Sequence, residues 1–318
     1  MKKLLSLCLA LLAGLVIASC SQDSKATYRF ITGGEAGTYY AFGSVIAQHA
    51  SNNTPFRFVG LAGSGSQGNI MALDDGTADM AFAQSDVLSY AYQGVNNFIE
   101  NGKVDCFSVV AALYPEQLQI VTLDPSIRTV ADLRGKAVSI GAAGSGVYFN
   151  AIDILGAYGL TEEDIKATYQ SFGDSAAALK DGKIDAAFIV AGAPTTAVTD
   201  LATTKKVYLV SLDETHANIL VARSPYYMQA TIPKETYGLA QDARTVAVGA
   251  VVIARDDMPA EAVYSFCADL FENAPSLVSS HAKYKEIFPE YGAAVQSVPY
   301  HPGAAKYFAE KGFAVPTK

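Results

Sequence analysis

The chain lacks most of the residues and motifs on which catalytic and nucleic-acid-binding proteins rely. It has no tryptophan and only four histidines among 318 residues. Lys and Arg total 23 against 31 Asp and Glu, and they form no basic cluster, so a nucleic-acid partner is disfavoured. No nucleophile elbow, Walker loop or H-E-x-x-H zinc motif occurs. We therefore expect neither catalysis nor a bound metal or cofactor.

Long apolar runs are also scarce, and the one that stands out lies at the N-terminus. Two lysines precede residues 4–18, an uncharged run that is short for a membrane span and typical of a signal peptide. The run ends at Ala18-Ser19-Cys20, which resembles the cleavage site of bacterial lipoproteins. Residues 1–19 would be removed, Cys20 would carry the lipid, and residues 20–26 would form a tether. An ordinary signal peptide cut near Ala18 is the alternative.

We therefore expect an extracytoplasmic protein that is anchored to a bacterial membrane, facing the periplasm or the outer surface, and does not span it. With Cys8 removed and Cys20 lipidated, the remaining cysteines are Cys106 and Cys267. Their spacing matches no metal or redox motif. The compartment would permit a disulfide, but two buried thiols are the interpretation that we favour.

What the chain does have is a glycine-rich turn that occurs twice. Residues 31–43, ITGGEAGTYYAFG, join a strand at 28–31 to a helix that should reach about residue 50. Glycine lets a backbone approach a ligand closely, and a helix N-terminus presents unpaired N–H groups and a positive dipole end. Residues 138–149, VSIGAAGSGVYF, repeat the arrangement. We interpret both as anion-binding loops, and ordinary tight turns are the alternative.

A second repeat supports the first. Residues 73–82, LDDGTADMAF, recur as residues 179–188, LKDGKIDAAF. The offset is too long for a solenoid, whose units span about 20–50 residues, and it suits two similar lobes. Alternating strands and helices predict an α/β fold with parallel strands and helices on both faces. One large sheet with chance similarity is the alternative.

The expected elements divide the chain into these lobes. Residues 27–114 and 248–318 should form lobe 1, residues 115–247 should form lobe 2, and strands near Tyr114 and Ala247 should cross between them. A helix is expected from residue 70 to about residue 75, and another at 176–180. Further strands are expected at 56–60, 80–82, 107–113, 119–123, 169–172, 186–190, 207–212 and 245–254.

Several short motifs, in this order and spacing, resemble the TAXI family of solute receptors for TRAP transporters. They are Thr32-Gly33-Gly34 with Gly37-Thr38-Tyr39-Tyr40, Gly65-Ser66 with Asn69, Gln84-Ser85-Asp86, Leu113-Tyr114-Pro115-Glu116, Gly144-Ser145-Gly146, Ala191-Gly192 with Pro194, and His301-Pro302-Gly303-Ala304.

The likeness covers residues 27–312. It implies a type II periplasmic-binding-protein fold, with a ligand cleft between two α/β lobes. It also implies a small carboxylate ligand, such as an acidic amino acid or an oxo- or dicarboxylic acid, and delivery to a permease driven by an ion gradient. The lipid anchor departs from the freely diffusing receptors of that family. Val147 departs as well, because many members have Thr or Ser there.

The candidate ligand-binding residues come from the turns and from strand ends, where ligands collect in open α/β sheets. Backbone N–H groups at Gly37-Thr38 and Ser145-Gly146 should hold the carboxylate, because the turns contain no arginine. The tyrosines could instead be core aromatics, and Asp86 could cap a helix or pair with a ligand amino group. The full set is Gly37, Thr38, Tyr39, Tyr40, Ser66, Asn69, Gln84, Asp86, Tyr114, Ser145, Gly146, Val147, Gly192 and Pro194.

The sequence thus predicts a monomeric receptor that captures a small carboxylate and hands it to a TRAP-type permease. Two other classes of function remain open. One is an extracytoplasmic hydrolase with Ser66 or Ser145 as nucleophile, which would need a base within hydrogen-bond reach. The other is a sensor or adhesin module with no transport role.

Overall fold

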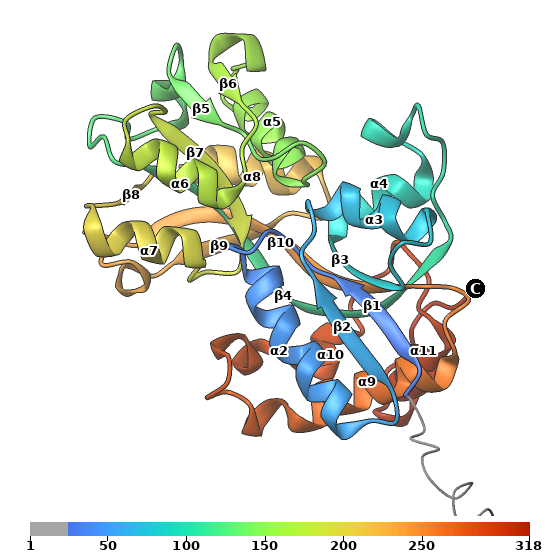
Figure 1. The fold of residues 1–318 in the computed structure, drawn as a ribbon. Coiled ribbons are helices and arrows are strands. Elements are labelled where there is room, and N and C mark those ends of the chain that lie inside the picture. The colour runs from blue at the N-terminus through green and yellow to red at the C-terminus, as the bar shows by residue number, and fades with distance from the viewer. Residues whose placement is uncertain (1–24) are drawn as a thin grey trace, which may run out of the picture.

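The computed structural model describes residues 25–318, so the predicted signal peptide and Cys20 lie outside the described part. The described chain forms two α/β lobes around one mixed sheet (Figure 1). The strands follow the order β2-β1-β3-β10-β4-β7-β5-β6, with β8 paired to β4 and β9 paired to β10. Two long antiparallel strands, β4 (Phe107–Thr122) and β10 (Ala243–Arg255), run through both lobes.

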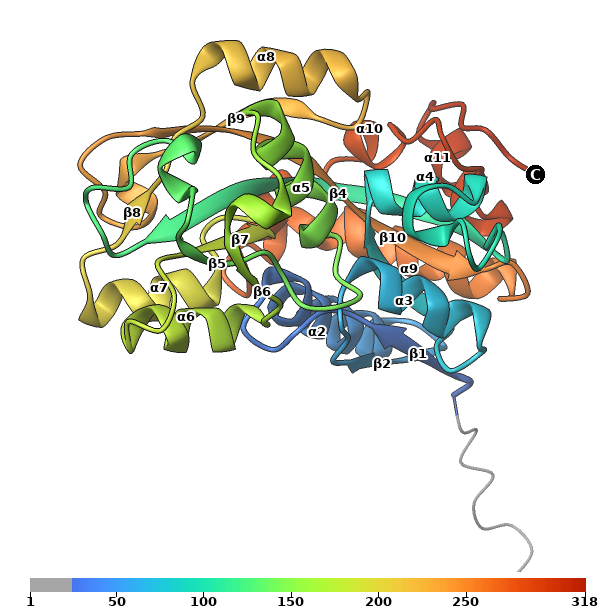
Figure 2. The same ribbon diagram turned by 90° about the horizontal axis from the view of Figure 1, so that it is seen from above.

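The two halves of these long strands belong to different lobes. Residues 250–254 of β10 pair with β3 in lobe 1, whereas residues 117–122 of β4 pair with β7 in lobe 2. In Figure 2 the pair crosses the middle of the molecule, with α8 on one face of the lobe 2 sheet and α6 and α7 on the other. The two-lobed α/β fold expected from the sequence is confirmed.

Lobe 1 has parallel strands at its N-terminal side and receives further helices from the C-terminal end of the chain. Its elements are β1 (Thr27–Ile31), α2 (Thr38–Asn53), β2 (Arg57–Leu61), α3 (Ser66–Asp74), β3 (Met80–Gln84), α4 (Ser85–Gln93), α9 (Ala260–Asn273), α10 (Pro289–Gly292) and α11 (Pro302–Glu310).

Lobe 2 repeats the alternation of strand and helix. Its elements are β5 (Ala137–Ser139), α5 (Val147–Ala157), β6 (Lys166–Thr168), α6 (Phe172–Lys180), β7 (Ala186–Ala191), α7 (Thr196–Thr204), β8 (Tyr208–Leu209), α8 (Glu214–Arg223) and β9 (Met228–Ile232).

Short 3₁₀ turns occur in both lobes. They are η1 (Asn96–Phe98), η2 (Val130–Leu133), η3 (Glu162–Asp164), η4 (Lys234–Thr236), η5 (Ala274–Ser276) and η6 (Ala282–Glu286).

Each lobe has its own buried apolar core. One cluster contains β4 as far as Tyr114 and β10 from Ala250 onward. Two further clusters, one on each face of the lobe 2 sheet, contain β4 from Leu118 and β10 as far as Val248. On β4, only residues 115–117 separate the core of lobe 1 from the cores of lobe 2, so the polar stretch between the cores is short. That stretch contains Glu116.

Several elements differ from their predicted bounds. The expected strands 107–113 and 119–123 are one strand, because Pro115 lies opposite Gly249 beside a bulge, where a missing N–H is tolerated. The expected strand 169–172 is wrong, since β6 ends at Thr168 and Phe172 opens α6. Helix α3 begins at Ser66, four residues earlier than predicted.

Cys106 and Cys267 are free thiols, partly and fully buried, and burial raises the pKa of Cys106 to about 11. Between residues 25 and 318, none of the helices has the length and apolar character that crossing a membrane requires.

Candidate ligand-binding site

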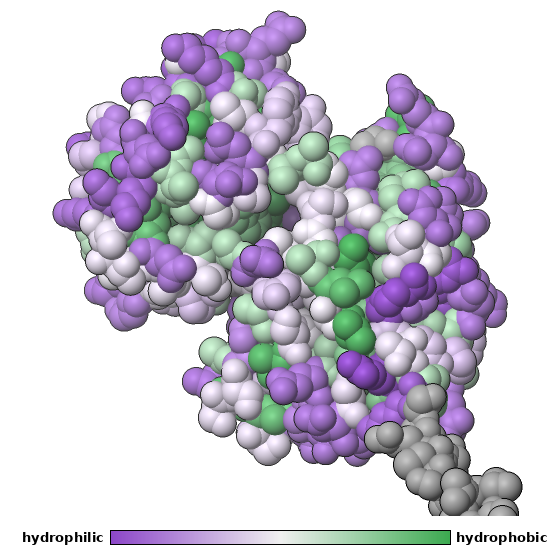
Figure 3. Space-filling view, in the orientation of Figure 1, coloured by the Kyte–Doolittle hydropathy of each residue, from purple (hydrophilic) through white to green (hydrophobic). Residues whose placement is uncertain are grey.

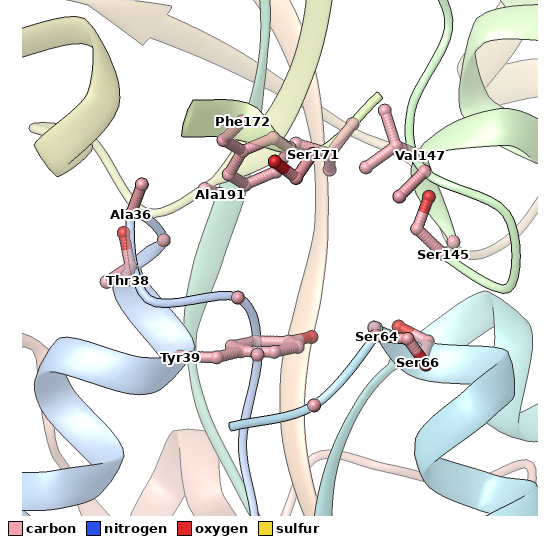
Figure 4. A pocket seen from close by; sticks show the side chains of 18 of the residues that line it. Ala36, Thr38, Tyr39, Ser64, Ser66, Ser145, Val147, Ser171, Phe172 and Ala191 are labelled. Carbon is pink, nitrogen blue, oxygen red and sulfur yellow. The ribbon is translucent and has the colours of Figure 1, made fainter. Parts of the chain in front are cut away.

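A cavity of about 370 Å³ lies between the two lobes. The space-filling view shows the surface hollowed there (Figure 3), and the close-up shows side chains from both lobes around it (Figure 4). Its lining comprises Gly33, Gly34, Glu35, Ala36, Gly37, Thr38, Tyr39, Gly63, Ser64, Gly65, Ser66, Gln84, Glu116, Ala142, Ser145, Gly146, Val147, Gln170, Ser171, Phe172, Gly173, Asp174, Val190 and Ala191.

Four helices begin at this cavity. Their N-cap residues, Gly37 for α2, Gly65 for α3, Gly146 for α5 and Ser171 for α6, all line it. Glycine has no side chain with which to cap a helix, so the first N–H groups of α2, α3 and α5 receive no capping side chain. Helix N-termini favour negative charge, and no Lys, Arg or His is among the cavity-lining residues.

Tyr39 forms the floor of the cavity. Its ring stacks on Phe82 with centroids 4.5 Å apart, and Figure 4 shows it lying across the lower side of the site. The hydroxyl donates a 2.5 Å hydrogen bond to Oε2 of Glu116, which is only 2% exposed. Burial raises the pKa of Glu116 to about 8, although the hydrogen bond from Tyr39 lowers it. The floor therefore offers a carboxyl group that is readily protonated near neutral pH.

The lobes touch on one side of the cavity through the start of α2. Thr38 Oγ1 donates to the carbonyl of Gly192 at 2.7 Å, and the amide of Ala197 donates to the carbonyl of Ala36 at 3.1 Å. Both bonds join the first glycine turn to the loop after β7 or to α7. This side of the cavity is therefore closed by backbone and small side chains.

The other side is closed by a buried polar network between α4 and α5. Gln84 Nε2 donates to Oδ1 of Asn150 at 3.0 Å, and Asn150 Nδ2 donates to Oδ2 of Asp86 and to the hydroxyl of Tyr227, both at 2.9 Å. Tyr227 in turn donates to Asp153 at 2.8 Å. Burial raises the pKa of Asp86 to about 6, partly offset by its hydrogen bonds. We call Gln84, Asp86, Asn150, Asp153 and Tyr227 the interlobe network.

Eight of the residues predicted to bind ligand line the cavity, and six do not. Those that line it are Gly37, Thr38, Tyr39, Ser66, Gln84, Ser145, Gly146 and Val147. Those outside the lining are Tyr40, Asn69, Asp86, Tyr114, Gly192 and Pro194.

The six predicted residues outside the lining make contacts elsewhere in the structure. Asn69 is fully buried and donates to the carbonyls of Thr32 and Phe82, which ties α3 to the end of β1 and to the middle of β3. Tyr114 lies behind the floor with Lys283 5.0 Å from its ring centroid. Asp86 belongs to the interlobe network, and Gly192 accepts from Thr38. Tyr40 is half-buried on α2, and Pro194 is exposed.

Sequence reasoning missed several residues of the site. Glu116 is the only charged residue of β4, a pattern that could have marked it, but the expected strand break at Pro115 hid its place on the crossing strand. Ser171 and Phe172 were assigned to a strand and instead begin α6 at the cavity. Gln170, also assigned to that strand, lies in the loop before α6, and Ser64 lies in the loop before α3.

The geometry offers little to a serine nucleophile. Ser66 Oγ accepts the amide of Gln84 at 3.0 Å, and Ser145 Oγ has no hydrogen-bond partner within residues 25–318. No histidine or lysine lines the cavity to act as a base. Across the same residues, no group of three His, Cys, Asp or Glu side chains is arranged to hold a metal ion.

Two lobes on one mixed sheet, two crossing strands and an interlobe cavity define the type II periplasmic-binding-protein fold. Residues 30–312 match the NMT1-like family, and the chain belongs to that family. The TAXI family suggested by the motifs is a narrower assignment than this match shows.

Solved structures share the fold at low sequence identity. The alkanesulfonate-binding protein SsuA from Xanthomonas axonopodis pv. citri, bound to MOPS, is 18% identical over 89% of this chain and 83% of its own, with a TM-score of 0.53. A putative L-cystine ABC transporter protein from Listeria monocytogenes is 16% identical over 84% and 98%, with a TM-score of 0.50. The GluR0 ligand-binding core in complex with L-glutamate is 8% identical over 83% and 100%, also with a TM-score of 0.50.

Proposed function

We propose that this protein is an extracytoplasmic solute receptor that captures a small carboxylate between its lobes. The main support for this proposal is that four helix N-termini, two from each lobe, meet at one interlobe cavity. Backbone N–H groups and helix dipoles can hold an anion without a cationic side chain. The cavity volume of about 370 Å³ suits a metabolite rather than a peptide.

The ligand class is supported by which residues line the cavity. Gly37, Thr38, Ser145 and Gly146, proposed from sequence to bind the carboxylate through backbone N–H groups, lie on opposite lobes and all line the site. The amides of Gly37 and Ser145 already donate to the carbonyls of Gly34 and Ala142, so the amides of Thr38 and Gly146 are the ones proposed to hold the carboxylate. A ligand that touches both lobes favours the closed arrangement over an open one by its differential contacts. Acidic amino acids and oxo- or dicarboxylic acids are the proposed ligands.

Delivery to a membrane permease follows from this role and from the predicted leader. The motif order favours a TAXI-type receptor for an ion-gradient-driven TRAP permease. The Listeria protein of similar fold is described as part of an ABC transporter, which would instead require an ATPase. The neighbouring genes discriminate these: a multi-span permease without an ATPase supports the TRAP proposal, and the absence of any permease supports a sensor.

A thermal-shift screen of the mature chain tests the receptor proposal directly. A ligand that binds only the folded state stabilises it by about 2.7 kcal/mol at a hundredfold excess over Kd. We expect at least one amino acid or small carboxylate to raise the melting temperature clearly. If amino acids, oxo-acids, dicarboxylates and sulfonates all leave it unchanged at millimolar concentration, the proposal is wrong.

Lipid attachment at Cys20 is a separate proposal, supported by the residues that precede it. Mass spectrometry of the protein extracted from membranes should show a diacylglycerol-modified Cys20 as the first residue. A soluble form cut near Ala18 would contradict the anchor without affecting the receptor role.

A further inference from the structure

The cavity lining contains one buried carboxyl group, that of Glu116. Glu35, Glu116 and Asp174 are the acidic residues of the lining. Glu35 and Asp174 are exposed to solvent, and Asp174 is engaged with the Ser171 cap of α6. Glu116 is buried at the floor, on strand β4 where it crosses between the lobes. Its charge therefore acts on any ligand at short range and with little solvent screening.

No cationic side chain in the described part of the chain forms an ion pair with the carboxyl group of Glu116. Within residues 25–318, Tyr39 provides the only hydrogen bond to its carboxyl group, and that bond occupies Oε2. Lys283 lies behind the floor, but its ammonium group pairs with Glu286 at 2.6 Å and faces the ring of Tyr114. Buried carboxylates are normally paired with a cation or protonated, because an unpaired buried charge is costly.

The walls of the cavity have the opposite character. The N-termini of α2, α3 and α5 begin there with glycine caps, so their positive ends surround the acid at the floor. Such a cavity complements a small molecule that carries both charges. An acidic group fits the walls, and a cationic group fits the floor.

We propose that the ligand carries a protonated amino group that pairs with Glu116, while its acidic group binds the helix N-termini. This inference rests on the proposed receptor function and narrows its ligands to zwitterionic amines such as amino acids. It excludes oxo-acids and dicarboxylates as preferred ligands. Glu116 then determines specificity, and Tyr39 orients its carboxyl group.

If Glu116 pairs with a ligand amino group, ligand affinity should depend on pH in a way that a purely structural role of Glu116 would not produce. Burial holds the pKa of Glu116 at about 8, so an ammonium ligand must displace a proton below that pH. Its affinity should fall by up to about tenfold for each pH unit from 8 to 6, whereas a dicarboxylate should bind no worse. The other ionisable groups that face Glu116 are Tyr39 on α2, Asp86 on α4, Tyr114 on β4, Lys283 on η6 and Tyr291 on α10.

The experiment compares ligands that differ only at the amino group. Isothermal titration of the mature chain would use L-glutamate against 2-oxoglutarate and glutarate, and L-alanine against pyruvate. Glu116→Gln keeps the shape of the side chain and removes its charge. Glu163→Gln makes the same charge change at an exposed position outside the cavity lining and is the matched control. Titration at pH 7 in two buffers of different ionisation enthalpy measures the released proton.

We expect an amino acid to bind at least tenfold more tightly than its oxo-acid, with proton release, and Glu116→Gln to abolish both effects. Glu163→Gln should preserve them. Equal or tighter binding of the oxo-acids overturns the amino-group proposal and leaves the carboxylate receptor intact. If no member of either series binds and the thermal-shift screen also finds no ligand, both proposals are wrong. If Glu116→Gln does not fold, proton release by the parent protein still decides the matter.

Discussion

The two glycine turns look alike in sequence but use glycine for different reasons. In the first turn, none of Gly33, Gly34 and Gly37 has a positive φ, and a side chain at Gly33 would approach the Cβ of Tyr39 to 2.9 Å. In the second turn, Gly141 and Gly144 adopt φ of 94° and 79°. Close packing thus requires glycine at Gly33 in lobe 1, whereas backbone conformation requires it at Gly141 and Gly144 in lobe 2.

The repeated Asp-Gly segments, in contrast, perform the same task in both lobes. Asp79 accepts the amide of Arg29 at 2.7 Å and so joins the start of β3 to β1. Asp185 accepts the amide of Ala137 at 2.7 Å and joins β7 to β5 in the same way. The glycines that end the preceding helices, Gly76 and Gly182, have φ of 67° and 70°. The two lobes therefore join their strands in the same way, whereas the glycine turns that line the cavity differ between them.

The lobes also bring different groups to the site. Lobe 1 supplies Tyr39, stacked on Phe82, together with Ser66 and Gln84. Lobe 2 supplies mainly small or apolar groups, such as Ser145 and Val147. This difference suggests that ligand binds lobe 1 first and that lobe 2 then encloses it by a hinge at the crossing strands.

Among the variants considered, a replacement of Gly146 should have the largest effect on ligand binding, because it should block the closure of lobe 2 over lobe 1. Its φ of −70° is ordinary, but an added Cβ would fall 1.5 Å from Gln84 Oε1 and 3.0 Å from Val87 across the lobe boundary. Gly146→Leu should weaken ligand binding by about a hundredfold, equivalent to about 2.7 kcal/mol, with little change in the ligand-free melting temperature. Calorimetric titration and thermal unfolding measure the two quantities.

Small-angle scattering supplies the conformational readout for this variant. The parent should become more compact with ligand, and Gly146→Leu should not. Gly156→Leu lies on the same helix with open space around the added Cβ and should behave as the parent does. Contraction of the Gly146 variant at parental affinity would show that closure does not bring Gly146 against Gln84.

The interlobe network should make stability depend on pH through lobe 1's Asp86. Burial raises its pKa from 3.8 to about 6, so the folded protein holds the proton more tightly than the unfolded chain does. The free energy of unfolding should therefore fall as pH rises from about 4 to about 6, by on the order of 3 kcal/mol, and stay lower above that. Glu116 acts in the same direction and extends the fall to about pH 8.

Asp86→Asn should remove the share of the fall that Asp86 contributes between about pH 4 and pH 6, and leave the fall due to Glu116, which runs from about pH 4.5 to about pH 8. Urea unfolding of the parent and the variant at half-unit pH steps measures the difference. A difference that grows instead above pH 6 would mean that Asp86 is not the titrating group.

Removing the two repeated aspartates tests whether the sheets are built alike. Asp79→Ala and Asp185→Ala each leave a strand amide without its acceptor and should each cost about 1–3 kcal/mol. Asp79→Ala should cost somewhat more, because Asp79 also accepts from the guanidinium of Arg29. That addition is small, since Arg29 is 43% exposed.

Chemical denaturation measures both losses, and Asp181→Ala, at an exposed position beside Gly182, is the control. A loss in only one lobe would contradict the structural equivalence of the two segments.

The smallest expected effect distinguishes the two turns directly. Gly144→Ala places Ala in a left-handed conformation and should destabilise the protein by about 1–2 kcal/mol. Gly34→Ala has no positive φ and open space around the new Cβ, so it should be neutral or stabilise by up to about 1 kcal/mol. Urea midpoints of the two variants should move in opposite directions or differ clearly. Equal destabilisation would show that both turns need glycine for its conformation.

Local patterns were sufficient to predict much of this protein. The glycine turns, the Asp-Gly repeats and the alternation of strand and helix predict two α/β lobes, because each pattern depends on residues only a few positions apart. Helix N-termini directed at a shared edge follow from the same alternation, and eight predicted ligand residues do line the cavity.

The tertiary structure alone decided which residues meet across the lobes. Glu116 is buried because β4 continues through Pro115 opposite Gly249, a pairing with a segment more than a hundred residues away. Asp86 is drawn into the interlobe network because Asn150 of α5 lies beside it, and its sequence neighbours give no sign of this. Burial and charge pairing depend on distant contacts, so the chemistry of the cavity floor is set by the packing of the two lobes.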